Sequence, residues 1–333
     1  TSSTYNNEDI VSPDGTLSEN YMVNERDILL ARTGASTGKS YLYRKSDGKL
    51  YFAGFLIRAN VAEHNPYFVF SQLHTHRYWR WVSIMSSRSG QPGINSQEYA
   101  SFPNFTTTLI EENKISTLLS LIDERIATQN KIIEKLETLI KGIVDSIFTA
   151  NKFPKVPFKE IYVRAGEGGT PATSNPEYYD NGTIPFIKID DLQNKYIKTN
   201  KDCITELGLQ KSSAWIVPAN SIIYSNGATI GAISINLFPV CTKQGILGVV
   251  PKADINVEFL YYFMTSTAFT KAVERIVTEG TMRTAYLKDI NHIPCPVPYP
   301  VKQDEIAKML STLSEKLENE VIFQMKLQKQ KEF

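Results

Sequence analysis

The strongest constraint in this sequence is an internal repeat. The segment FPNF at 102–105 resembles IPCP at 293–296, and ENKI at 112–115 resembles QDEI at 303–306, each pair 191 residues apart. Upstream, RDILLARTG at 26–34 resembles NSIIYSNG at 220–227, where the matching glycines are 193 residues apart. Two one-residue insertions or deletions account for the drift. A chain with this repeat is expected to fold as two copies of one plan.

The repeat divides the chain into four parts. The first domain is expected over 1–109 and its helix over 110–150, and the second domain over 151–300 and its helix over 301–333. Nothing in the first copy corresponds to 151–191, and the second helix is the shorter one. Loss of the ends, with the N-terminal part of the first domain missing, is the simplest explanation. A permuted gene that begins inside a domain is the alternative.

The two predicted helices carry a heptad pattern of apolar residues. Steps of four and three residues separate these positions, and Gln129 interrupts the first series. At about 1.5 Å per residue, the first helix is roughly 55–60 Å long. A long amphipathic helix cannot bury its apolar stripe alone, so we expect the two helices to pack on each other rather than each on its own domain. The predicted seam residues are Ile115, Leu119, Ile122, Ile126, Ile133, Leu136, Ile140, Ile306, Leu310, Leu313 and Leu317.

The segments outside these helices have a different pattern. Short runs rich in β-branched and aromatic residues, such as 184–189 and 222–224, are separated by Gly, Pro, Asn and Ser. Helical segments are expected at 66–85, 257–264 and 268–277. The pattern predicts a mixed α/β domain in each copy.

Charge and cysteine content exclude several classes of protein. The chain has 36 Lys and Arg against 35 Asp and Glu, so a histone-like tail or a polybasic membrane binder is excluded. A local basic face stays possible, because the net charge averages over all faces. The three cysteines are far apart, which disfavours a disulfide scaffold or a zinc ribbon and favours a reducing compartment, the cytoplasm. The uncharged run 212–242 could span a bilayer by length, but its Pro, Gly and Asn favour strands and turns.

The segment GASTGKS at 34–40 resembles a phosphate-binding P-loop but departs from it in two ways. Three residues rather than four separate its glycines, and the following 41–43 favours a strand, whereas a P-loop opens a helix. Three interpretations stay open: a nucleotide-binding site, a glycine turn between strands, and a turn that approaches a phosphodiester backbone.

The sequence offers no other catalytic or metal-binding pattern. The four histidines form no cluster with Cys or Asp, the pair Asp190-Asp191 lacks a third ligand, and no G-x-S-x-G motif occurs. We therefore expect no catalytic residue, metal or cofactor in this chain.

Several segments have side chains suited to nucleic acid. HTHRYWRW at 74–81 interleaves basic and aromatic residues, and RSGQPGIN at 88–95 and EGTMRT at 279–284 occupy matching places in the two copies. Arg can pair with guanine and Gln or Asn with adenine, whereas Ser, Thr and Lys favour phosphates. The predicted DNA contacts are Arg32, Thr33, Ser36, Thr37, Lys39, Arg77, Arg80, Arg88, Gln91, Lys188, Ser225, Asn226, Thr229, Lys243, Gln244, Thr281 and Arg283.

The arrangement resembles the specificity subunit of type I restriction-modification enzymes. The resemblance rests on GGTP at 168–171, IPFIK at 184–188, the Gly-x-x-x-Gly turns, and the exit from IPCP at 293–296 to QDEI at 303–306. The first copy departs from the pattern, because it lacks the opening part of the domain and has FPNF at its exit.

The resemblance implies an α/β (α+β) fold with two target recognition domains separated by two long antiparallel coiled-coil helices. Each domain would read one half of a split double-stranded DNA site, and helix length would set the separation of the halves. The chain would do no chemistry. Methyltransferase (modification) subunits would bind S-adenosylmethionine and flip the adenine, and a restriction (motor-nuclease) subunit would use ATP and Mg²⁺.

Two other functions stay open from the residues alone. One is a P-loop-like nucleotide-binding enzyme that uses Lys39. The other is a coiled-coil scaffold that joins proteins without reading DNA.

Overall fold

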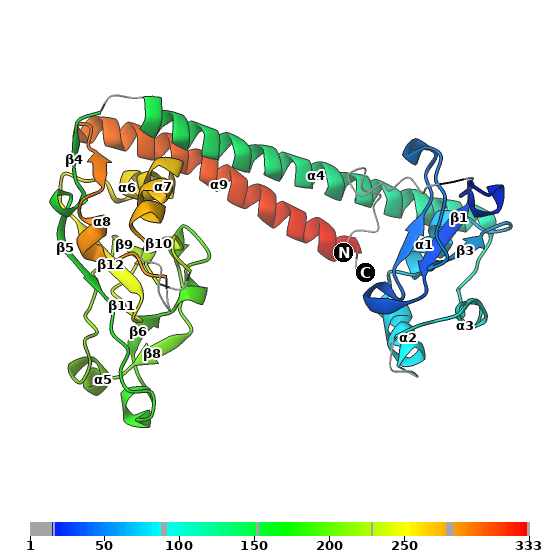
Figure 1. The fold of residues 1–333 in the computed structure, drawn as a ribbon, viewed down its shortest axis with the longest axis horizontal. Coiled ribbons are helices and arrows are strands. Elements are labelled where there is room, and N and C mark those ends of the chain that lie inside the picture. Colours follow the sequence, from blue (N-terminus) through cyan, green and yellow to red (C-terminus); the bar gives the residue numbers. More distant parts are fainter. Residues whose placement is uncertain are drawn as a thin grey trace. The chain divides into compact units, whose positions relative to one another are not determined.

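The computed structural model describes residues 15, 17–87, 92–150, 153–227, 229–277 and 283–331 (Figure 1). The chain divides into two compact units. Unit 1 comprises Thr1–Lys131 and Ile322–Phe333, and unit 2 comprises Ile132–Val321. Two long helices, α4 (Leu109–Ala150) and α9 (Pro300–Lys331), have residues in both units. The predicted segments 88–95 and 279–284 are described only in part, and Arg88, Gln91 and Thr281 lie outside the described residues.

Unit 1 is built on a three-stranded antiparallel sheet of order β2-β1-β3. The central strand is buried along its whole length, and Ile28 and Leu30 pack with Tyr78, Val82 and Phe102. The segment expected as one helix over 66–85 forms two helices, because Leu73 ends α1 and Thr75 caps α2. The elements are β1 (Asp27–Ala31), β2 (Ser40–Leu42), β3 (Leu56–Asn60), α1 (Pro66–Gln72), α2 (His76–Ser86) and α3 (Ser96–Ala100).

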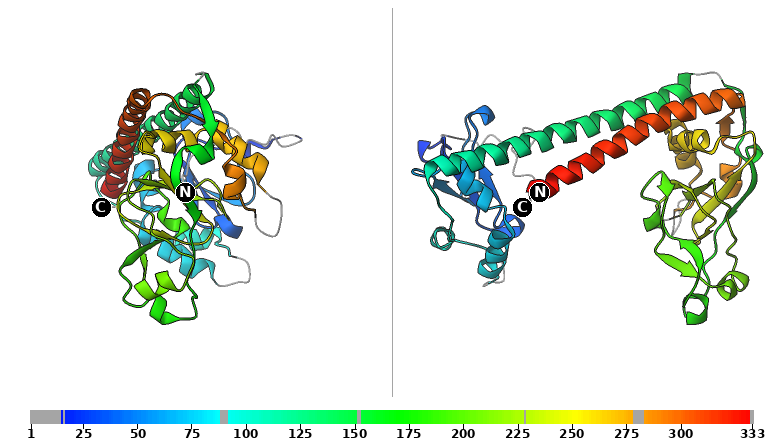
Figure 2. Two further views of the ribbon diagram at one scale, coloured as in Figure 1. Left: turned by 90° about the vertical axis from the view of Figure 1, so that its left-hand side faces the viewer. Right: turned by 180° about the vertical axis from the view of Figure 1, so that it is seen from behind.

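Unit 2 contains a larger sheet of order β5-β12-β9-β10-β7 and two smaller sheets, β11-β6-β8 and β13-β4. Figures 1 and 2 show α6 and α7 on the side of the large sheet that faces α9. The elements are β4 (Lys155–Pro157), β5 (Tyr162–Glu167), β6 (Ile184–Ile187), β7 (Tyr196–Ile197), β8 (Asp202–Ile204), α5 (Glu206–Gln210), β9 (Ser221–Ser225), β10 (Ile233–Asn236), β11 (Cys241–Thr242), β12 (Ile246–Pro251), α6 (Val257–Thr265), α7 (Thr267–Ile276), α8 (Leu287–Ile290) and β13 (Pro294–Pro296).

The two units share one structural plan. The order β2-β1-β3 in unit 1 corresponds to β10-β9-β12 in unit 2, and both sets of strands are antiparallel. The central strand follows a residue with positive φ in each unit, Arg26 (72°) and Asn220 (58°). The helix pair α1 and α2 in unit 1 corresponds to α6 and α7 in unit 2. A hydroxyl caps the second helix of each pair, from Thr75 at α2 and from Ser266 at α7. The predicted fold of two related α/β domains is confirmed.

The long helices run antiparallel where they pair in unit 1. Asp123 on α4 forms an ion pair with Lys331 at 2.5 Å, and Asn130, two turns further along α4, accepts a hydrogen bond from Gln324, two turns earlier on α9. Near them, the Arg125 guanidinium lies 5.2 Å from the Phe323 ring centre. In unit 2 the same two helices contribute to one core, which includes Val144, Phe148, Ile306 and Leu310.

Burial along the predicted seam varies. Ile306 and Leu310 are buried, whereas Leu119, Ile122, Ile126, Ile133, Leu136, Ile140, Leu313 and Leu317 are half-buried. The prediction for Ile115 is wrong, because its side chain is 41% exposed. Ser116 is buried in its place and donates a hydrogen bond to the side chain of Asn65 at 2.9 Å. This part of α4 therefore faces a polar joint rather than an apolar seam.

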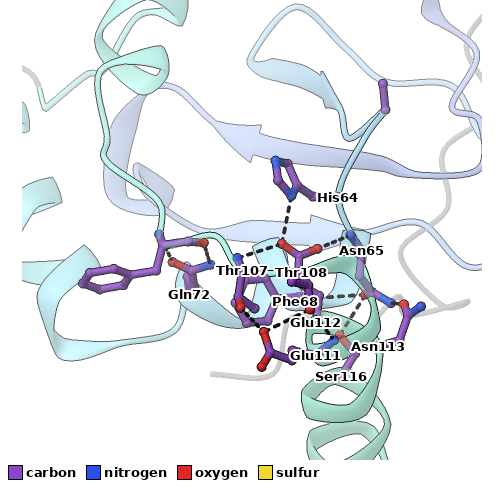
Figure 3. A network of polar contacts seen from close by, with 12 residues as sticks. His64, Asn65, Phe68, Gln72, Thr107, Thr108, Glu111, Glu112, Asn113 and Ser116 are labelled. Carbon is purple, nitrogen blue, oxygen red and sulfur yellow. Dashed lines mark hydrogen bonds and ion pairs between the residues drawn. The ribbon is translucent and has the colours of Figure 1, made fainter.

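The joint centres on Asn65, which caps α1 (Figure 3). Its side-chain Oδ1 accepts from two N–H groups in the first turn of α1, at 2.9 and 3.1 Å. From α4, Glu112 accepts from the Asn65 N–H at 2.8 Å and contacts His64 Nδ1 at 2.8 Å. Asn113 accepts from the Asn65 amide at 2.7 Å. The fully buried Glu112 side chain thus fixes the domain to the helix through two groups, the Asn65 N–H and His64 Nδ1.

Unit 2 repeats this joint with a neutral residue in place of the carboxylate. Asn256 caps α6, Gln303 on α9 accepts from the Asn256 N–H at 2.9 Å, and Asp304 accepts from the Asn256 amide at 2.7 Å. Each of these residues lies 191 positions after its counterpart in unit 1. The Gln303 amide donates to the carbonyl groups of Asp254 and Pro298 at 3.2 and 2.8 Å. The joint is therefore a shared feature, and its buried charge is specific to unit 1.

The charge of Glu112 gives the unit 1 joint a pH dependence. Burial alone would raise the pKa of Glu112, but hydrogen bonds from the Asn65 N–H and from His64 outweigh it, so its pKa lies below the ordinary carboxyl value. A carboxyl with a depressed folded pKa stabilises the fold fully above its unfolded pKa of about 4.3. That stabilisation is lost as pH falls through the folded value.

We predict that Glu112→Gln removes this pH-dependent component of stability. Glutamine keeps an acceptor for Asn65, as Gln303 does for Asn256, but does not titrate. Urea unfolding should show wild type losing more free energy of unfolding than Glu112→Gln between about pH 6 and pH 3. Glu124→Gln, which alters an exposed carboxylate on the same helix, should behave like wild type. Equal pH dependence in wild type and Glu112→Gln would contradict the prediction.

Candidate nucleic-acid interface

In unit 2, three connecting segments meet beyond the end of β9. The N–H groups of Asn226 and Gly227 donate to the carbonyl of Gly245 at 3.1 and 3.2 Å. The Ala285 N–H donates to the Asn226 carbonyl at 2.9 Å, and the Asn226 amide returns a bond to the Ala285 carbonyl at 3.1 Å. These bonds hold the β9–β10 turn, the β11–β12 turn and the segment that enters α8 against one another.

The GGTP and IPFIK segments join the same place. The Gln244 N–H donates to the Thr170 hydroxyl at 3.3 Å, and the Lys243 N–H donates to the Ile187 carbonyl at 3.0 Å. A Cβ at Gly168 would lie 2.0 Å from the Thr242 carbonyl oxygen, so only glycine fits there. The structure therefore brings together Lys188, Ser225, Asn226, Thr229, Lys243, Gln244 and Arg283, which were predicted from separate segments.

Exposure divides these seven residues. Thr229, Lys243, Gln244 and Arg283 are exposed, and Lys188 is half-buried and forms an ion pair with Asp202 at 2.9 Å. Ser225 and Asn226 are completely buried, so their side chains cannot touch a duplex in this conformation. Ser225 lies within a strand covered on both faces, and the Asn226 amide is bonded to Ala285. These two residues shape the turn instead of presenting a contact.

A cavity of about 330 Å³ lies beside the exposed residues of unit 2. Thr229 and Arg283 contribute to its lining together with Glu274 on α7 and Tyr224. Its wall therefore combines an aromatic surface with side chains of both charges.

Unit 1 holds its β1–β2 turn in the same way. The Gly34 N–H donates to the Pro92 carbonyl at 3.1 Å, and the Ile94 N–H donates to the Arg32 carbonyl at 2.9 Å. Thr37 is buried and uses its hydroxyl to bond the Gly34 carbonyl at 2.8 Å, so its predicted DNA contact is replaced by an internal one. The other predicted residues of this turn, which are Arg32, Thr33, Ser36 and Lys39, are exposed.

Helices α2 and α3 hold this turn through the hydroxyls of two tyrosines. The Tyr78 hydroxyl donates to the Gly38 carbonyl at 2.8 Å, and the Gly38 N–H donates to the Tyr99 hydroxyl at 3.1 Å. Burial raises the pKa of both tyrosines, which keeps their hydroxyls neutral as hydrogen-bonding groups.

Arg80 is exposed on α2, whereas the Arg77 guanidinium lies 4.3 Å from the Phe105 ring centre and 5.2 Å from that of Phe102. Arg77 is thus partly committed to packing within unit 1.

The 34–40 segment is a turn between two antiparallel strands. Gly34–Ser36 forms one turn of 3₁₀ helix, and Ser40–Leu42 continues as β2, which pairs with β1. A P-loop would need a helix there, with its N-terminal N–H groups around the phosphate. The predicted strand at 41–43 is confirmed over Tyr41 and Leu42, and the nucleotide-binding interpretation loses its structural basis.

Among the described residues, no three His, Cys, Asp or Glu side chains are grouped to hold a metal ion. Within the same part of the chain, no helix combines the length and the apolar character needed to cross a membrane.

The fold is that of a two-domain protein with paired long helices, and comparison with solved structures supports this class. An S subunit of a type I restriction-modification system from M. genitalium is 15% identical, with a TM-score of 0.61, over 92% of this chain and 81% of that chain. At this identity the likeness concerns the fold alone.

Sequence comparison identifies the family. Residues 155–326 match the profile described as the type I restriction modification DNA specificity domain, and the chain belongs to this family. The MjaIX specificity subunit of Methanocaldococcus jannaschii is 32% identical over 164 residues, which cover 48% of this chain and 38% of that protein. The MjaVIII specificity subunit of the same organism is 24% identical over 328 residues, covering 89% and 74%. The chain thus spans well under half of the first relative.

Sequence reasoning missed the joint residues Asn65 and Asn256. Each resembles an ordinary helix cap. The signal that could have found them is their separation of 191 residues, the same offset as that of Glu112 and Gln303.

We predict that Gly38→Ala destabilises the protein more than Gly34→Ala. Both glycines have positive φ, at 89° and 72°, so an alanine at either is strained. A Cβ at Gly38 would also lie 2.6 Å from Val82 Cγ1, whereas nothing lies within 4 Å of one at Gly34. Denaturant unfolding should show a loss of about 1 kcal/mol for Gly34→Ala and about 2–4 kcal/mol for Gly38→Ala. Equal losses would show that α2 does not confine the turn.

Proposed function

We propose that this chain is a non-catalytic, sequence-specific DNA-binding specificity subunit of a type I restriction-modification system. One observation carries the proposal. The same arrangement of connecting turns occurs twice, beyond β1 in unit 1 and beyond β9 in unit 2. Each of these surfaces exposes cationic and hydrogen-bonding side chains, including Arg32 and Lys39 in the first and Lys243 and Arg283 in the second. Two such surfaces fit a target site with two separate halves.

The exposed side chains match the chemistry of base edges and phosphates. Arginine can donate two parallel hydrogen bonds to guanine, glutamine can pair with adenine, and lysine or threonine can contact phosphates. The turns that present these groups are held by backbone hydrogen bonds, so the side chains can differ between the two surfaces without changing the turns. Each surface can therefore read its own half-site.

We propose that the chemistry lies on partner subunits. Methyltransferase subunits would bind S-adenosylmethionine and dock on the long helices, where Leu118, Leu121, Ile132 and Leu139 leave an exposed apolar stripe on α4. A restriction subunit would add ATP- and Mg²⁺-dependent translocation and cleavage. The near-neutral charge of the chain fits this division, because partners can supply phosphate contacts.

The proposal is tested by selection from a random duplex library. The full chain, assembled with its methyltransferase subunits, should enrich one bipartite sequence, and the same sequence should carry methylated adenine in the source genome only when this gene is intact. Failure to enrich any sequence would favour a scaffold that joins proteins without reading DNA.

We predict that Arg283→Ala weakens binding to the selected duplex by about 1–3 kcal/mol and relaxes preference at one position of one half-site. The reason is that the exposed Arg283 guanidinium would no longer donate two hydrogen bonds to a guanine. Affinities for single-position variants of the duplex provide the measurement. Lys308→Ala, which removes an exposed positive charge from α9, should leave the position preferences unchanged. A loss in Arg283→Ala that is equal for every duplex would reassign Arg283 to the phosphate backbone.

A further inference from the structure

The two units differ at a turn that occupies the same place in both. In unit 1 the Arg32 N–H donates to the carbonyl of Phe55 at 3.0 Å, and in unit 2 the Asn226 N–H donates to the carbonyl of Gly245 at 3.1 Å. The next residue closes the same turn in both, through Leu56 N–H to Ala53 carbonyl and Ile246 N–H to Lys243 carbonyl. Phe55 and Gly245 therefore occupy equivalent positions.

Strand register confirms this equivalence. Leu56 is opposite Ala31 in the β1–β3 pair, and Ile246 is opposite Ser225 in the β9–β12 pair. The residue directly before the strand is thus Phe55 in unit 1 and Gly245 in unit 2. Gly245 has a φ of 85°, a conformation in which a side chain is strained. Unit 2 keeps this point of its surface flat, and unit 1 places an aromatic ring there.

The Phe55 ring is not used by the fold of unit 1. Its residue is 73% exposed, the largest fraction among the exposed large apolar residues of the described part of the chain. By contrast, Phe52 in the same turn packs edge-on against Tyr21 and beneath Arg58. The backbone bond to Arg32 holds Phe55 next to the exposed Arg32 and Thr33. An uncovered ring on a backbone that is held in place, beside hydrogen-bonding groups, suits a partner with a flat apolar face.

We propose that Phe55 stacks on a base of the half-site that unit 1 reads, by insertion at a base step, and that unit 2 makes no such contact. The inference rests on the proposed function. Bases have flat π-faces, and proteins that read DNA insert apolar side chains between them, which unstacks the step locally. Binding through Phe55 would thus depend on how easily the base step unstacks. Hydrogen bonds to base edges do not provide this kind of selectivity.

The experiment uses the full chain assembled with its methyltransferase subunits and the duplex that wild type enriches from a random library. Phe55→Ala should lower affinity roughly 5- to 150-fold, the value of one stacked base, whereas Phe55→Trp should bind within about 3-fold of wild type. Tyr299→Ala is the matched control, because Tyr299 is also an exposed aromatic residue, at 69%, and lies at the beginning of α9. It should bind like wild type.

A spectroscopic measurement separates stacking from a simple apolar contact. With 2-aminopurine placed in turn along the duplex, wild type should raise the fluorescence at one step of one half-site apart from the flipped adenines, and Phe55→Ala should abolish that rise alone. Phe55→Leu should bind more weakly than Phe55→Trp. Wild-type affinity of Phe55→Ala, equal binding of the Leu and Trp variants, or no fluorescence change would overturn the proposal.

The outcomes also separate this proposal from the proposed function. If wild type enriches no sequence, the proposed function fails and Phe55 has no base to contact. If wild type enriches a bipartite sequence and Phe55→Ala reads it equally well, only the stacking proposal fails. Because the side chain is exposed, Phe55→Ala should unfold at the same temperature as wild type, so a loss of affinity is not a loss of fold.

Discussion

The attachment of each domain to a long helix depends on one asparagine that bonds in three directions. Asn65 and Asn256 each cap a short helix with the side-chain oxygen, and each gives its N–H and its amide to acceptors on the long helix. A buried donor left without an acceptor costs about 1–3 kcal/mol. A shift of the domain along the helix by even one residue would break these bonds together, so the joint fixes one register.

The surface that each unit presents depends on a second set of bonds, in which backbone groups predominate. Arg32 and Asn226 both give their N–H to the neighbouring turn and accept from the segment after the second helix. Since backbone groups carry this frame, the side chains around it are not constrained to be alike. Lys39 stands where unit 2 has Ala232, and Phe55 where it has Gly245. This variation around a common frame is what the proposed reading of two different half-sites requires.

The sequence predicted those features that follow from periodicity. The offset of 191 residues and the heptad steps were enough to predict two related α/β domains and two long helices. Ile115 continued the heptad series, but a polar joint rather than a helix covers that face, and spacing cannot report what lies opposite. Ser225 and Asn226 resembled turn residues open to solvent, yet neighbouring strands and Ala285 cover them. Phe55 belongs to no motif, and its exposure depends on a turn whose shape only the fold shows.

The charge of the chain constrains how it can act on DNA. Binding that relies on phosphate neutralisation needs many cations, and its strength falls steeply with salt. Here Lys and Arg exceed Asp and Glu by one, and Lys188 is already paired with Asp202. We therefore expect directional hydrogen bonds, as well as phosphate contacts, to contribute to binding at the proposed reading surfaces. A chain of this composition is better suited to choosing a site than to holding a duplex, which agrees with the proposal that partner subunits contribute to holding the DNA.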